Sequence, residues 1–171
     1  MAGGMNVSKA IEQAVSELLR DEAELGAGVT VRAWQSLAQD PNWKAEPDKA
    51  FPLIDVRCSA PAVDQAQSTL AVTCGILCAT KTQDDKDHAI VSAMYGEVER
   101  VIFALFSAFR RGDDEDEVYS AFLARIIALV DNASAFSFGG FQIGEASPPS
   151  DDNGASIIGM SLIVNYSWLD F

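Results

Sequence analysis

The sequence has few basic residues and no cluster of them. Twelve lysines and arginines stand against 25 aspartates and glutamates, which gives a formal net charge of −13. Arg110 and Arg111 are the only adjacent basic pair. Binding to nucleic-acid phosphates needs a clustered positive surface, so this composition argues against it. An acidic surface serves solubility, and it would also repel a polyanion that passes close by.

Long apolar runs are also missing. The longest are only a few residues, well short of the ~20 that span a bilayer. Residues 1–5 lack the basic-then-apolar layout of a secretory signal. We therefore expect a soluble, intracellular chain with no membrane partner.

Cysteine is scarce and odd in number. Cys58, Cys74 and Cys78 each lie in an apolar strand pattern, and none is part of a Cys-x-x-Cys spacing. We predict buried free thiols rather than disulfides or zinc ligands.

Recognisable catalytic chemistry is missing too. His88 is the only histidine, and its place at the start of a predicted helix offers it no expected partner. The sequence contains no Gly-x-Ser-x-Gly motif, no phosphate-binding glycine loop and no recognisable acid/base pair of carboxylates. We predict a non-enzyme with no catalytic residue, metal or cofactor. The alternative is a small α+β enzyme or ligand-binding domain with a pocket between the central helix and the sheet.

What the sequence does contain is one long amphipathic helix, predicted over residues 84–111. Asp84, Asp85 and Asp87 are suited to its first turn, and Gly112 follows two arginines at its end. Apolar residues recur between these ends at three- and four-residue steps. The apolar stripe is wide, which is typical of a helix buried in a monomer or of one that also meets a partner subunit.

The remaining elements flank this helix. We predict a single domain over residues 1–171, with a helix at 8–25, strands at about 29–34, 51–59 and 67–82, an extra helix at 116–132 and a C-terminal hairpin at 136–168. Residues 60–66 are expected to form a turn, and Glu12 to lie on the polar face of the first helix. The fold class is α+β, a mostly antiparallel sheet with the helices packed on one face. In the final strand, alternate residues from Met160 to Trp168 should face the core.

Five consecutive acidic residues, 113–117, precede the extra helix. They lack the alternating ligand positions and the central glycine of a calcium loop. Acids are favourable at a helix N-terminus, so we interpret them as a cap and a solvated charge run rather than a cation site.

Several residues are candidates for a partner interface. Two polar, proline-containing segments, 35–50 and 145–154, are predicted to be mobile loops. Trp43 is a large aromatic in the first of them, which either folds back on its own domain or anchors a partner. Phe103 points away from the main apolar seam of the central helix. The full set of candidates is Trp43, Lys44, Phe103, Pro148, Pro149, Asp151 and Asp152.

The order of elements resembles the tail terminator and tail completion (neck) proteins of long-tailed bacteriophages. The resemblance rests on the N-terminal helix, the strand near Val31, the Phe51-Pro52-Leu53-Ile54 strand, the strand at 70–80, the helix at 84–111 and the closing hairpin that ends in Ser161-Leu162-Ile163-Val164-Asn165-Tyr166. Relative to smaller members of that family, the predicted helix at 116–132 looks like an insertion.

This resemblance implies a structural virion protein, assembled in the bacterial cytoplasm. It implies a homo-oligomeric ring, usually a hexamer, that caps the tail tube, ends tail polymerisation and then receives the head connector. DNA would pass through such a ring without specific binding, and the acidic balance fits that role.

Overall fold

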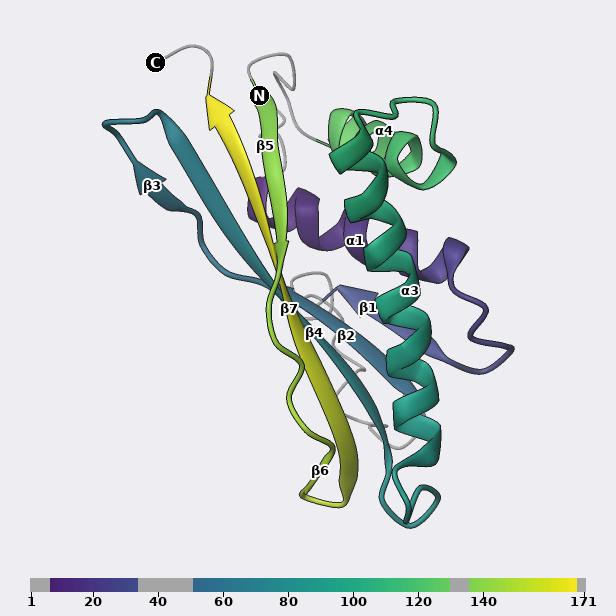
Figure 1. The fold of residues 1–171 in the computed structure, drawn as a ribbon. Helices are drawn as coiled ribbons and strands as arrows, with labels where there is room; N and C mark the ends of the chain where they lie inside the picture. The colour runs from purple at the N-terminus through teal and green to yellow at the C-terminus, as the bar shows by residue number, and fades with distance from the viewer. Residues whose placement is uncertain (1–6, 34–50, 130–135, 169–171) are drawn as a thin grey trace.

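A computed structural model describes residues 7–33, 51–129 and 136–168. In these ranges seven strands form one mixed sheet, and three helices lie together on one side of it (Figure 1). The predicted α+β class is confirmed at this level. No helix in the same ranges is long and apolar enough to cross a membrane.

The sheet has the strand order β1-β2-β4-β7-β5, with β3 paired to β4 and β6 paired to β7. The strands are β1 (Thr30–Ala33), β2 (Leu53–Cys58), β3 (Ala62–Asp64), β4 (Thr69–Lys81), β5 (Phe136–Ile143), β6 (Ser150–Asp152) and β7 (Ala155–Trp168). β1 pairs with β2 in parallel, and the other described pairings are antiparallel. The strands predicted at about 51–59 and 67–82 correspond to β2 and β4, which pair antiparallel.

Strands β4 and β7 form the frame of the sheet. They pair without interruption from Thr69 opposite Ser167 to Lys81 opposite Ala155, which corresponds to about 43 Å of strand. Met160, Leu162 and Val164 of β7 are buried while the residues between them are partly exposed. The predicted alternation of this strand is confirmed for the side chains that the structure describes.

Helix α3 (Ala89–Arg111) lies along the sheet and is about 35 Å long. Its end agrees with the prediction, because Gly112 adopts a left-handed conformation and its N–H reaches the carbonyls of Ala108 and Phe109. Its predicted start at residue 84 is wrong. Residues 81–88 form backbone-bonded turns instead, and the helix begins after His88, which is itself left-handed at φ 56°.

Helix α1 (Val7–Glu22) contacts β1 and β2 on one side and helix α4 (Glu117–Leu129) on the other. Because two layers cover it, α1 buries polar residues such as Ser8 and Ser16 beside its apolar face, while Lys9, Gln13 and Glu17 stay partly exposed. Our placement of Glu12 on an exposed face is therefore wrong. Glu12 is fully buried, and its carboxylate accepts a hydrogen bond of 2.8 Å from the backbone N–H of Cys58.

The turns differ from prediction at two places. Residues 62–64, expected within a turn, form β3, and the turn after it is closed by the carboxylate of Asp64, which accepts from the N–H groups of Ala66 and Gln67. The segment 145–154, expected to be a mobile loop, contains β6. Asn153 and Gly154 link β6 to β7 with φ of 49° and 81°, the conformation of a two-residue hairpin turn.

Candidate interaction surface

The helices cover one face of the sheet, and no described element covers the other. On this open face, alternate positions of the long strands carry mostly small or polar side chains, with Leu77 and Ile163 as apolar exceptions. On β4 these are Thr73, Gly75 and Leu77, and on β7 they are Gly159, Ser161, Ile163 and Asn165. Leu77 has 36% of its surface exposed.

A groove of about 470 Å³ crosses the open face. Gly75, Leu77, Gly159 and Ser161 line its middle, Asp55 and Arg57 of β2 lie at one end, and Glu145 and Ser147 lie at the other. Two backbone hydrogen bonds hold residues 144–147 beside β7. The N–H of Gly144 donates to the carbonyl of Ser161, and the N–H of Ser147 donates to the carbonyl of Gly159. Because β4 and β7 separate β2 from this segment, the groove spans three strand spacings, about 14 Å.

The β2 end of the groove carries both a carboxylate and arginines, whereas the opposite end carries a carboxylate. Asp55 at the β2 end lies within ion-pair distance of Arg32 (3.4 Å) and Arg57 (3.9 Å). Burial raises the pKa of Asp55, and the two arginines offset only part of this effect. The Arg57 side chain is 57% exposed, so it presents positive charge to solvent. Glu145 is an exposed carboxylate at the opposite end.

A second candidate surface lies on the outer side of α3, where Phe103 and Arg110 are exposed and Phe106 is partly buried against the core. Glu99, Phe103, Phe106 and Arg110 follow one another at steps of four, three and four residues, so they form one row along the helix. Phe103 is 49% exposed, as predicted from its position off the seam. The guanidinium of Arg110 lies 6.0 Å from the centre of the Phe106 ring. We call this row the outer row of α3.

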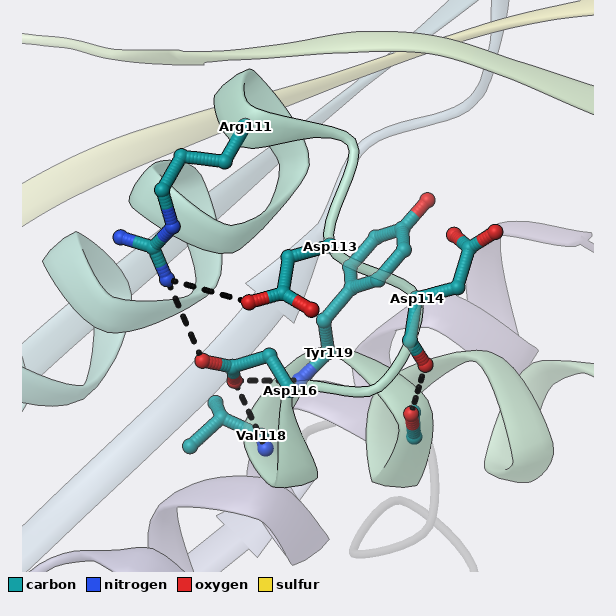
Figure 2. Close-up of polar contacts among 7 residues, drawn as sticks. Arg111, Asp113, Asp114, Asp116, Val118 and Tyr119 are labelled. Carbon is teal, nitrogen blue, oxygen red and sulfur yellow. Dashed lines mark hydrogen bonds and ion pairs between the residues drawn. The ribbon is translucent and has the colours of Figure 1, made fainter.

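The acidic turn between α3 and α4 is a helix cap, as predicted (Figure 2). The carboxylate of Asp116 accepts hydrogen bonds from the N–H groups of Val118 (3.1 Å) and Tyr119 (3.4 Å). Arg111 lies between Asp113 and Asp116, at 3.7 and 3.4 Å. Among the described residues no group of three or more histidines, cysteines or acids is placed to hold a metal ion.

The prediction of three free thiols is wrong for two of them. Cys58 and Cys74 lie directly opposite each other on β2 and β4 and form a disulfide. Their pairing depends on strand register, which a cysteine count does not give. Cys78 is free and buried as predicted, and burial raises the pKa of its thiol to about 12. At neutral pH it stays protonated and is a poor nucleophile.

The expectation that His88 has no partner is also wrong. Its Nδ1 lies 2.6 Å from the hydroxyl oxygen of Ser156 at the start of β7. Ser156 is fully buried, so this serine is not placed to attack a substrate from solvent. The pair joins the N-terminus of α3 to the sheet.

Asp85, close to His88, is 3% exposed and caps α3 from four residues before its start. Its carboxylate accepts from the N–H groups of Ile90 and Val91, both at 2.8 Å, and from the hydroxyl of Thr80 at 3.0 Å. Burial alone would raise the pKa of Asp85. The three hydrogen bonds and the nearby His88 outweigh burial and lower it.

The predicted interface residues do not form one site. Phe103 lies on α3, whereas Pro148, Pro149, Asp151 and Asp152 are exposed along the β6 edge of the sheet. Trp43 and Lys44 lie outside the described residues. The groove on the open face was not predicted as a site. Its sequence signal is the run of small residues that alternate with buried ones along β4 and β7.

Comparison with known proteins adds no relative. No family model matches the chain, and no curated protein matches its sequence.

Proposed function

We propose that this chain is a structural protein of a bacteriophage tail, which forms a ring at the end of the tail tube. The observation that supports this most is the one-sided layering of the fold. Helices lie on one face of the sheet, the other face is open, and the helix layer exposes Phe103 on its own outer side. A chain with two such surfaces can join to copies of itself. The long helix α3 and the mostly antiparallel sheet also suit the element order of the tail terminator family.

In this proposal the ring is a homohexamer with two further partners. One side caps the tube protein and ends tail polymerisation, and the other receives the head connector. DNA passes through the centre without specific binding, and the net charge of −13 supports this because an acidic channel repels the DNA backbone. The chain acts in the virion, after assembly in the host cytoplasm, and performs no catalysis.

A ligand-binding domain is the second candidate, supported by one cavity. A space of about 350 Å³ lies beside α3, lined by Ile90, Met94 and Glu97 of the helix and by Val29 and Pro52 next to the strands. Its volume is at the lower end for small-molecule sites. Deeper along the helix, Val98, Ile102 and Leu105 are fully buried, and apolar side chains fill the helix–sheet interface there.

Tail length tests the proposed function. Tubes assembled from tail tube protein in the presence of this chain should stop at a defined length. Growing tubes should stop elongating when the chain is added to them. Without it they should grow to variable length. Electron microscopy of tubes with and without the chain measures this. Tubes that keep growing, with no ring density at their ends, would contradict the proposal.

A further inference from the structure

We propose that the outer row of α3 in one copy docks into the groove on the open sheet face of the next copy. This inference rests on the proposed ring function and identifies the two surfaces that would build the ring. It follows from three observations: matching length, matching charge order and matching relief.

The lengths agree. From Glu99 to Arg110 the outer row advances by eleven residue steps, about 16 Å of helix. The groove runs from Arg57 to Glu145 across three strand spacings, about 14 Å. A helix laid across the strands therefore places both ends of the row over the charged ends of the groove.

The charges are opposite at both ends. The row begins with a carboxylate, Glu99, and ends with a guanidinium, Arg110. One end of the groove has the exposed guanidinium of Arg57 beside Asp55, a carboxylate that also pairs with Arg32, and the other end has the carboxylate of Glu145. One orientation sets Glu99 against Arg57 and Arg110 against Glu145, whereas the reversed orientation sets like charges together. Charge order therefore fixes the direction of docking.

The shapes of the outer row and of the groove also match. Between its charged ends the row carries two phenylalanines, and Phe103 is the more exposed. The middle of the groove is low because Gly75 and Gly159 have no side chain and Ser161 has a small one. Leu77 offers an exposed apolar contact there. An aromatic ring from a helix can thus approach the sheet closely and bury apolar surface on both sides.

The two surfaces belong to opposite layers of the same copy, the helix layer and the open face of the sheet. Such a contact is head-to-tail, because each copy gives its helix to one neighbour and its groove to the other. Repeated with a closing rotation it produces a ring, and this is the geometry that the proposed function needs.

Charge exchange tests the contact. Arg110→Glu and Glu145→Arg, made separately, should each raise the concentration at which assemblies dissociate by about tenfold or more, because each sets like charges together. The double variant Arg110→Glu/Glu145→Arg should return to within about threefold of the wild-type chain, because the pair is restored with its signs exchanged. Sedimentation velocity over a concentration series measures this, with circular dichroism to confirm folding.

Two matched controls separate docking from net charge. Glu115→Arg changes the net charge as Glu145→Arg does, and Lys86→Glu changes it as Arg110→Glu does. Both residues are exposed and lie outside the outer row and the groove. Neither control should alter assembly.

The outcomes distinguish the inference from the function on which it rests. Rings that form equally well in both single variants, or single variants that the exchange does not rescue, would overturn the docking contact and leave the ring proposal standing. A wild-type chain that stays monomeric at all concentrations, and on tail tubes, would overturn both.

Discussion

Replacing Asp85 by alanine should destabilise the chain more than any other single change to an acidic residue outside α1. The substitution removes three hydrogen bonds to a buried carboxylate, two of which satisfy the free N–H groups of Ile90 and Val91. A lost helix cap costs about 1 kcal/mol, and hydrogen bonds to a charged group are worth about 1.5–3 kcal/mol. We expect the free energy of unfolding to fall by about 3 kcal/mol.

Thermal unfolding followed by circular dichroism measures this loss. For a chain of this size, 3 kcal/mol corresponds to a Tm lower by about 6–12 °C. Asp84→Ala is the matched control. The carboxylate of Asp84 is exposed, and among the described residues it makes no hydrogen bond to helix α3. A Tm for Asp85→Ala within about 1 °C of this control would refute the account of the cap.

The same carboxylate gives a pH dependence with a definite sign. The pKa of Asp85 is lower in the folded chain than its ordinary value of about 3.9, so its contribution is complete at neutral pH. The contribution is lost as pH falls below about 4 and through the folded pKa. The stability gap between the wild type and Asp85→Asn should therefore narrow in this acidic range. A gap that stays constant down to pH 2 would show that charge is not the cause.

The remaining predictions concern assembly, chemistry and the disulfide. Phe103→Asp should keep the fold and abolish assembly, because the Phe103 side chain is half exposed in the monomer. A variant that unfolds instead would place Phe103 in the core. His88→Ala should leave biological activity near wild type. It should lower the free energy of unfolding, measured by chemical denaturation, by about 1 kcal/mol through the lost contact with Ser156. A folded, fully assembled variant without activity would support an enzymatic function instead. Reduction of the disulfide between Cys58 and Cys74, which are 16 residues apart, should lower the free energy of unfolding by about 3 kcal/mol, as denaturation with and without reductant can measure. An unchanged denaturation midpoint would show that the disulfide does not stabilise the fold.

The elements that could be predicted from sequence are those whose pattern is local. Strand β7 alternates strictly from Met160 to Tyr166, and the structure buries one set of these residues. The end of α3 is marked by two arginines and a glycine, and the left-handed Gly112 is found there. The Asn153-Gly154 pair is a hairpin signal of the same local kind. The C-terminal hairpin is predicted from the sequence, but strand β6 is not, because the prolines and acids beside this pair favour a mobile loop.

The features that could not be predicted depend on distant parts of the chain. Glu12 looks like a solvent-facing residue until β2 is known to lie against α1, where the carboxylate of Glu12 accepts a hydrogen bond from the N–H of Cys58. The disulfide needs the register that sets Cys58 opposite Cys74. Helix α3 begins only after His88. The carboxylate of Asp85 accepts from the N–H groups of Ile90 and Val91, so Asp85 caps the helix from the preceding turn and is not part of its first turn. The groove exists only because β2 and the 144–147 segment are brought to opposite sides of β4 and β7.

The mass of the particle in solution tests the central claim most directly. The account predicts that the purified chain, or the chain added to tail tubes, forms a closed ring of identical subunits. Native mass spectrometry should then give six times the 18.3 kDa of one chain, and images of tube ends should show one ring on each capped tube. A single species of 18.3 kDa across the micromolar range, with bare tube ends, would contradict the account.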